Sequence, residues 1–117
     1  MTLYESFLEA VTTEYDTLRV LKQSPRGTVS VVRHKKSGTR YVFRRYSGSG
    51  EVYRRLLPVL CPHLPQIMEA AEQDGQTAVL EEYVQGDTLA ELLMGARLTE
   101  REARQVTMQL CQALHVL

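Results

Sequence analysis

The chain has 117 residues, of which 44% are hydrophobic and 24% are charged, and its 14 basic side chains equal its 14 acidic ones. This composition is typical of one globular domain and excludes a disordered, fibrous or membrane-embedded chain. The formal net charge of zero gives no electrostatic reason to expect a nucleic acid or a membrane as partner.

The first segment is predicted to form a short amphipathic helix over residues 3 to 13. Its apolar residues recur at helical spacing, with glutamates between them: Leu3, Phe7, Leu8 and Val11. We treat residues 1–14 as a helical extension that precedes the main domain.

Three β-rich runs follow and predict an antiparallel meander. They cover residues 17–21, 28–33 and 40–46, and turn-forming residues gather at 24–27 and 35–38. Connections this short join antiparallel neighbours, because a parallel crossover needs about a dozen residues or more.

A glycine-rich stretch at residues 47–50 predicts a flexible break before a second helix. That helix begins near Glu51, and Pro58 is expected either to kink it or to end it near Leu57, because proline lacks the backbone donor that a helix interior needs. Two further strands are predicted near residues 66–71 and 77–84.

The last third of the chain is predicted to contain two helices. Asp87 is expected to cap the first, which runs through Met94 and stops at Gly95. The second opens at Thr99 with the Thr-x-x-Glu form of a capping box. It still continues at Leu117, so we expect the natural protein to extend further.

Thiols and imidazoles are too scattered to form a metal site or a disulfide framework, since neither cysteine nor histidine recurs at ligand spacing. The N-terminus also lacks the basic start and apolar run of a signal peptide. We therefore expect a cytoplasmic protein without a metal site.

These elements predict an α+β fold with a five-stranded antiparallel sheet, one helix between the third and fourth strands, and two helices after the sheet. Four segments carry further detail: a hairpin at 20–32, a strand ending at Arg44, a Cys-Pro-His-Leu-Pro linker at 61–65, and the run Leu-Glu-Glu-Tyr-Val-Gln-Gly-Asp-Thr-Leu at 80–89.

In this order the segments resemble the N-terminal lobe of a serine/threonine-type protein kinase. They correspond to its glycine-rich hairpin, its Val-Ala-Ile-Lys strand, the linker after its C helix, and its hinge. The resemblance implies a lobe at residues 15–85, followed by the D and E helices of the second lobe at 86–117. An unrelated α+β domain and a small-molecule phosphotransferase are the alternatives.

The resemblance implies an ATP site beneath the hairpin. Only the third glycine of the glycine-rich pattern is present, as Gly27. The apolar ceiling over an adenine would come from Leu21, Val29 and Val42, although ordinary strand packing would also explain these positions. Weak ATP binding is the expectation, with magnesium bound only in the presence of a complete second lobe.

Arg44 stands where the family has its phosphate-binding lysine. Glu51 is the expected helix partner of Arg44, and the alternative is two solvated charges. Glu81 falls at the back of the pocket, where a carboxylate is costly unless paired. It would pair with Arg44, or the strand register differs by one residue.

The hinge would offer its backbone groups to the adenine edge at Glu82, Tyr83 and Val84. Thr88 falls where the family often contacts the ribose. No Asp-x-x-x-x-Asn or Asp-Phe-Gly run occurs in the chain, and these motifs carry the catalytic aspartate and the metal ligands of the family. We therefore expect no catalytic residues and no phosphoryl transfer by this chain.

A stand-alone, non-catalytic interaction module of the pseudokinase type is the second interpretation. Under either interpretation, the apolar stripe of the last helix predicts a homodimer. That stripe consists of Val106, Leu110, Leu114 and Leu117, with Ala113 beside them.

Overall fold

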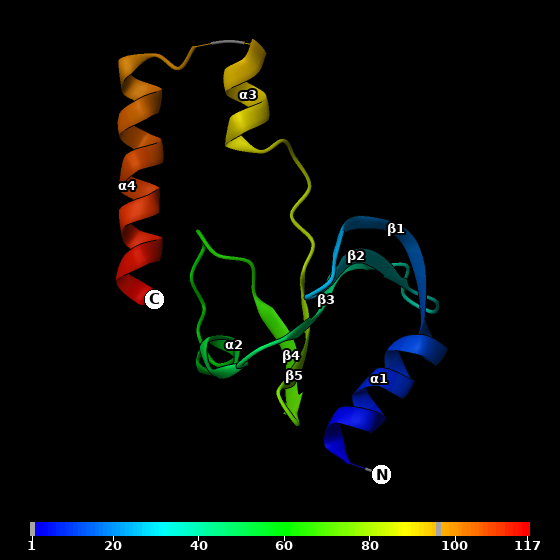
Figure 1. Ribbon diagram of the computed structural model, residues 1–117. Coiled ribbons are helices and arrows are strands. Elements are labelled where there is room, and N and C mark those ends of the chain that lie inside the picture. The colour runs from blue at the N-terminus through cyan, green and yellow to red at the C-terminus, as the bar shows by residue number, and fades with distance from the viewer. Residues whose placement is uncertain (1, 96) are drawn as a thin grey trace.

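The computed structural model describes residues 2–95 and 97–117. It confirms the predicted α+β fold (Figure 1). In chain order the elements are α1 (Leu3–Glu14), β1 (Tyr15–Ser24), β2 (Gly27–His34), β3 (Arg40–Ser47), α2 (Glu51–Leu56), β4 (Ile67–Gln73), β5 (Gln76–Glu82), α3 (Leu89–Gly95) and α4 (Glu100–Val116).

All five strands form one antiparallel sheet in the order β1-β2-β3-β5-β4. Arg44 of β3 lies opposite Val29 of β2, and Val42 of β3 lies opposite Glu81 of β5. Paired residues of an antiparallel sheet share a face, and alternate residues of a strand do so too. These four residues therefore lie on one face, which we call the inner face.

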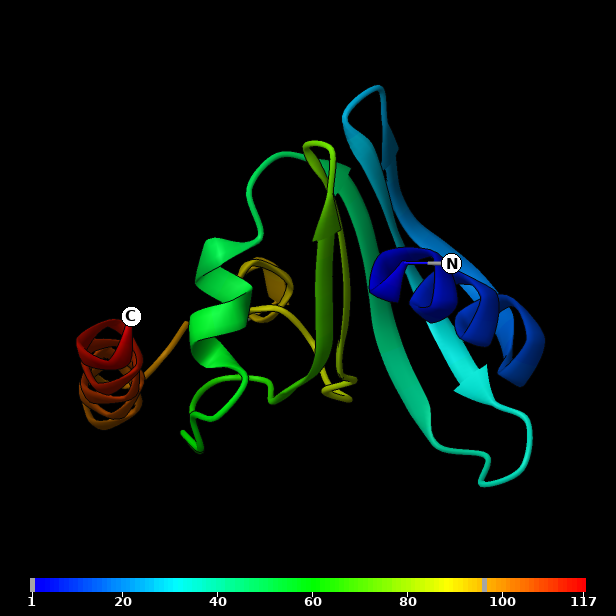
Figure 2. The same ribbon diagram turned by 90° about the horizontal axis from the view of Figure 1, so that it is seen from below.

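The outer face is covered by α1 (Figure 2). Tyr4, Phe7 and Val11 of α1 are buried there, and the Phe7 ring meets Phe43 of β3 edge-on with 5.9 Å between ring centroids. The same cluster includes buried residues of β2 and β5, namely Val32, Ala78 and Leu80. The predicted N-terminal helix is confirmed, and it contributes to the main hydrophobic core.

The loop at residues 47–50 is anchored, which corrects the expected flexible break. The Thr77 hydroxyl donates to the Gly48 carbonyl at 2.7 Å, and the Gly50 amide donates to Oε2 of Glu72, also at 2.7 Å. A Cβ at Gly50 would lie 2.8 Å from Cγ2 of Thr77. Glycine is therefore required here by a close approach to the sheet, which the sequence pattern alone does not reveal.

Two helices follow the sheet, and Figure 1 shows α3 and α4 set apart from the strands. The first predicted cap is wrong: the Thr88 hydroxyl, not Asp87, accepts the Glu91 amide at 3.1 Å. Thr88 directly precedes Leu89, the first helical residue, so its side chain is within reach of that amide. None of the described helices is long and apolar enough to cross a bilayer.

The predicted capping box of α4 is confirmed. The Thr99 hydroxyl accepts the Glu102 amide at 3.1 Å, and the Glu102 carboxylate accepts the Thr99 amide at 3.0 Å. The bond from the Thr99 backbone amide, and then the bond with its side chain, hold the pKa of the Glu102 carboxyl below its ordinary value.

Acid is expected to loosen the start of α4. Because the folded-state pKa of Glu102 is lowered, its contribution is present above the ordinary carboxyl pKa and is lost as the pH falls through the folded-state value. We expect the Ala103 amide, which donates to the Thr99 carbonyl, to lose hydrogen-exchange protection between about pH 5 and pH 3. In Glu102→Gln the protection factor of the Ala103 amide should stay constant over the same pH range. An equal loss of protection in the variant and the wild type would contradict the capping role of Glu102.

Candidate functional site

A cavity of about 240 Å³ lies on the inner face beneath the β1–β2 hairpin. Residues from the hairpin, from β3 and from α2 line it: Lys22, Ser24, Arg26, Gly27, Thr28, Val29, Arg44, Tyr46, Ser47 and Tyr53. Three of these ten side chains are cationic and none is a carboxylate. The cavity therefore attracts anions, so we call it the basic cavity.

Gly27 has a packing role in this wall. A Cβ at this position would lie 2.1 Å from the Arg45 carbonyl oxygen and 2.7 Å from Cα of Tyr46. No side chain fits at such distances, so β2 requires glycine in order to pass this close to β3. The same contact explains the residue whether or not a ligand binds.

Arg44 forms an ion pair with Glu81 across the neighbouring strands β3 and β5. The Nε atom of Arg44 donates to Oε1 of Glu81. The Glu81 side chain is only 8% exposed, whereas the Arg44 side chain is 37% exposed. The Glu81 carboxylate is therefore buried, whereas the guanidinium that pairs with it remains partly exposed. The pair also agrees with the strand register that the sequence predicted.

The expected pair between Arg44 and Glu51 does not form. Glu51 instead accepts from Arg55 one helical turn along α2, at 2.7 Å. Arg44 takes the partner that the sequence analysis named as its alternative, Glu81. The pairing depends on β3 and β5 being neighbours, which places the two side chains on one face at close range.

Two tyrosines complete the wall on the α2 side. The rings of Tyr46 and Tyr53 have centroids 6.2 Å apart, and the Tyr46 hydroxyl donates to the Ser49 carbonyl at 2.7 Å. Burial raises the pKa of the Tyr46 hydroxyl. Tyr46 therefore stays neutral at physiological pH and adds no negative charge to the basic cavity.

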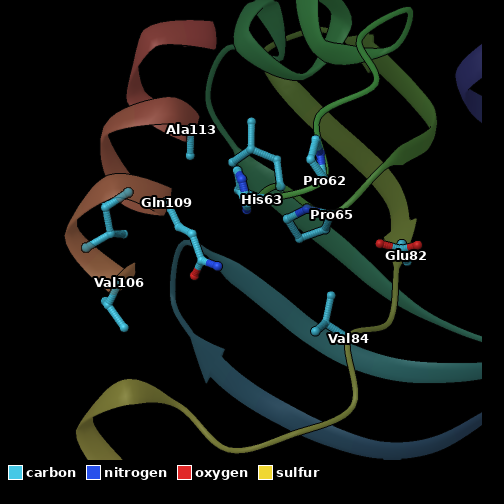
Figure 3. A pocket seen from close by; sticks show the side chains of 10 residues that line it. Pro62, His63, Pro65, Glu82, Val84, Val106, Gln109 and Ala113 are labelled. Atoms are coloured by element: carbon cyan, nitrogen blue, oxygen red, sulfur yellow. The ribbon is translucent and has the colours of Figure 1, made fainter. Parts of the chain in front are cut away.

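A larger cavity, of about 610 Å³, separates α4 from the linker before β4 and from the end of β5 (Figure 3). Its lining is mixed, with prolines and His63 on one side and α4 on the other: Pro62, His63, Leu64, Pro65, Glu82, Val84, Val106, Gln109, Leu110 and Ala113. Val106 and Leu110 of the predicted dimer stripe therefore border this cavity.

The structure divides the predicted site residues between these places. The basic cavity brings together Gly27, Val29 and Arg44. Glu82 and Val84 line the larger cavity. The remaining four line neither of the two: Leu21, which is half exposed, Val42, which is buried in the sheet, Glu51 and Thr88.

The backbone of the predicted hinge is partly occupied by hydrogen bonds within the protein. The Glu82 amide donates to the Gln66 carbonyl at 2.8 Å, so it is not available to a ligand. Within the described part of the chain, no hydrogen bond engages the backbone of Val84, whose side chain is exposed. Only the later part of the predicted hinge therefore has a free backbone donor and acceptor.

Lys22, Arg26 and the two tyrosines are the residues that sequence reasoning missed. Lys22 lies opposite Val29 in the β1–β2 ladder, so strand alternation placed it on the inner face once the register was known. Arg26 lies in the turn, where no periodicity indicates the direction of a side chain.

Among the described residues, no group of three His, Cys, Asp or Glu side chains could hold a metal ion.

No family model matches the chain, and no curated protein matches it. Several solved structures, however, match the chain. Two crystal structures of the PknI kinase domain from Mycobacterium tuberculosis match 89% of this chain with TM-scores of 0.67 and 0.66, both at 19% sequence identity. The chain spans about half of those kinase domains, 47% and 48%. The chain therefore has the fold of a protein-kinase N-terminal lobe, with α2 in the place of the C helix.

Proposed function

We propose that this chain is the ATP-binding lobe of a protein-kinase-like protein, and that the basic cavity receives the phosphates. The observation that carries the proposal is the position of Arg44. By the sequence resemblance it stands at the place of the phosphate-binding lysine on the third strand, and it lines the basic cavity together with two further cations. In the kinase family that the sequence resembles, the residue at this place on the third strand binds nucleotide phosphates, which supports assigning the basic cavity to them.

The remaining parts of the nucleotide have candidate contacts nearby. Val29 lines the same cavity and offers an apolar surface to the sugar and base. The backbone of Val84 is free to pair with an adenine edge, a role that does not depend on side-chain identity. The sequence at residues 80–89 supports a protein kinase over a small-molecule phosphotransferase, and the serine/threonine type is proposed from the family resemblance alone.

We propose further that the 117 residues bind nucleotide without transferring phosphate. The chain contains no asparagine, and its three aspartates are Asp16, Asp74 and Asp87. They lie in β1, in the β4–β5 turn and before α3, and none lines the basic cavity. Phosphoryl transfer in kinases needs an aspartate that accepts the substrate proton and oxygen ligands for magnesium.

Calorimetric titration of the whole chain with ATP tests the binding. Replacing Arg44 would leave Glu81 buried and unpaired, so the informative variant is the double change Arg44→Met with Glu81→Leu, which removes the cation and keeps the sheet apolar. We expect it to weaken ATP binding about tenfold or more, since hydrogen bonds to charged groups contribute about 1.5–3 kcal/mol. Arg44→Lys should retain binding, because it keeps the charge.

Arg45→Met is the matched control, because Arg45 is the next residue of β3 and therefore points to the outer face. It should leave the affinity for ATP unchanged. If the wild-type chain does not bind ATP, or if the Arg45 variant loses as much affinity as the double variant, the proposed phosphate site is wrong.

A second candidate function is a homodimeric interaction module, as the sequence predicted. The observation in its favour is the exposure of apolar side chains on α4, where Leu110 is 54% exposed and Leu114 is 67% exposed. Exposed leucines at helical spacing are typical of helix–helix contacts. A second copy of the chain can cover both stripes at once through a two-fold axis.

Light scattering at tens of micromolar protein should therefore give the mass of a dimer. The double change Leu110→Glu with Leu114→Glu should convert it to a monomer, because it places charges in an apolar contact. Gln105→Glu with Gln112→Glu adds the same charge on the opposite side of α4 and should leave the dimer intact. A wild-type monomer, or a dimer that survives the leucine changes, would exclude this interface.

A further inference from the structure

We infer that Glu81 is the positioning residue of the phosphate site, because it holds the Arg44 guanidinium at the basic cavity from within the sheet. In protein kinases the partner of the cation on the third strand is a glutamate of the C helix. The inference rests on the proposed function and names the group that orients its phosphate-binding cation. It makes the placement of that cation a property of β3 and β5 rather than of α2.

The strand ladder brings the two side chains together. Arg44 of β3 lies opposite Val79 of β5, which is two residues before Glu81. Arg44 and Glu81 are therefore diagonal neighbours on the inner face. Diagonal neighbours of an antiparallel pair are within reach of each other when their side chains are long. The contact consequently depends only on the pairing of β3 with β5, and it is present wherever the sheet has formed.

Burial of the carboxylate ties it to Arg44. The Glu81 side chain is almost fully buried, and its two neighbours across the ladders, Val42 of β3 and Ile67 of β4, are buried as well. A carboxylate in apolar surroundings is strongly destabilising without a counter-charge. The Nε atom of Arg44 supplies that charge. The folded chain therefore holds the guanidinium beside Glu81 before a ligand binds.

The guanidinium keeps donors for a ligand. An arginine side chain has five N–H donors in a fixed planar fork, and the bond to Glu81 is made by the one on Nε. The Arg44 side chain is partly exposed and lines the basic cavity. Paired guanidinium donors match two phosphate oxygens. A carboxylate that holds Nε therefore fixes the plane of the fork and leaves the terminal nitrogens for a phosphate.

The glutamate of α2 has a different partner. Glu51 accepts from Arg55, one helical turn further along α2, at 2.7 Å. The pair of Arg44 with Glu81 joins two strands of the sheet instead. A shift of α2 relative to the sheet would therefore leave the phosphate-binding cation in place.

Two neutral replacements of Glu81 test this role, because they carry the same charge and differ in one acceptor. In Glu81→Gln the amide oxygen still accepts from Nε of Arg44, whereas in Glu81→Leu the guanidinium is free to move. We expect Glu81→Leu to bind ATP about fivefold more weakly than Glu81→Gln, since binding must then immobilise a long side chain. Calorimetric titration of the whole chain measures both affinities, and circular dichroism verifies that both variants are folded.

A charge effect alone gives a different result. Removal of a negative charge beside the cavity would tighten the binding of an anion, and by the same amount in both variants. Glu51→Leu is the matched control, because it makes the same replacement in α2. It should leave the affinity for ATP unchanged. If Glu51 were the group that positions Arg44, Glu51→Leu would lose affinity and Glu81→Leu would not.

The pair is also observable without a nucleotide. The Nε–H group of Arg44 can be assigned in heteronuclear NMR spectra by its absence from Arg44→Lys. In the wild type it should exchange slowly with water, because it donates to a buried carboxylate. Its exchange should become faster in Glu81→Leu and stay slow in Glu51→Leu. Fast exchange in the wild type would overturn the inference, whatever the affinity for ATP.

The outcomes separate the inference from the proposed function. Equal affinities of Glu81→Gln and Glu81→Leu for ATP overturn the inference and leave the ATP site standing. A loss of affinity in Glu51→Leu as large as the loss in Glu81→Leu does the same. If the wild-type chain does not bind ATP, the proposed function is wrong and the inference falls with it, even where slow exchange of the Nε–H group confirms the ion pair.

Discussion

Arg44→Met is expected to destabilise the fold by about 3 kcal/mol, since removing one partner of a buried ion pair leaves the other charge without compensation. The charge left behind is Glu81, whose side chain is 8% exposed and lies against Val42 on the inner face. Urea unfolding followed by circular dichroism would show the loss as a lower midpoint with an unchanged slope.

Glu81→Leu should cost much less, about 1 kcal/mol, because the remaining guanidinium is one-third exposed and recovers water. The double variant, Arg44→Met with Glu81→Leu, should have a urea midpoint close to that of the wild type. The reason is that a well-packed apolar pair replaces a buried ion pair with little or no loss of stability. Equal effects of the two single changes, or simple additivity in the double variant, would contradict this asymmetry.

Phe7→Ala is expected to cost about 3–4 kcal/mol, which is the effect of removing a buried aromatic ring from a core. The Phe7 side chain is buried between α1 and the outer face of the sheet, where its ring meets Phe43 edge-on. A loss of this size is a large fraction of the stability of a small domain. Thermal unfolding, with the midpoint compared under identical conditions, measures it.

Leu3→Ala is the matched control within the same helix. Leu3 is 88% exposed, so its replacement should change the unfolding free energy by less than about 0.5 kcal/mol. If α1 were an independent extension, Phe7→Ala would leave the unfolding of the sheet unchanged, and that result would contradict the packing described here.

Phe7→Ala and Arg44→Met also separate folding stability from ligand binding. Phe7 lies on the outer face and Arg44 on the inner face, so the sheet divides the hydrophobic core from the basic cavity. A change at Phe7 should therefore lower stability without altering the proposed binding of ATP to the molecules that remain folded. A change at Arg44 should affect both.

Local signals in the sequence were sufficient to predict the helices and strands and their order along the chain. Short turns joined the strands as antiparallel neighbours, Pro58 follows the end of α2 closely, and the Thr99–Glu102 capping box begins α4 as predicted. These signals act over a few residues, through backbone donors, turn geometry and side-chain periodicity. The order of such elements was enough to predict the kinase-lobe fold.

Pairings across the sheet were harder to predict. The sequence left two partners open for Arg44, and the adjacency of β3 and β5 selected Glu81. Thr88 replaced Asp87 as a cap because the helix begins one residue later than predicted. Hydrophobic periodicity cannot locate the start of a helix to within one residue. A shift of one residue nevertheless changes which side chain accepts the hydrogen bond from the Glu91 amide.

The sequence by itself therefore determined the strands, the helices, their order and the place of Arg44 on the third strand, because each depends on neighbours along the chain. Only the tertiary structure decided that α1 packs into the core, that residues 47–50 are anchored, and that Lys22 and Arg26 share a cavity with Arg44. These features depend on residues far apart in sequence, which meet only when the sheet has formed.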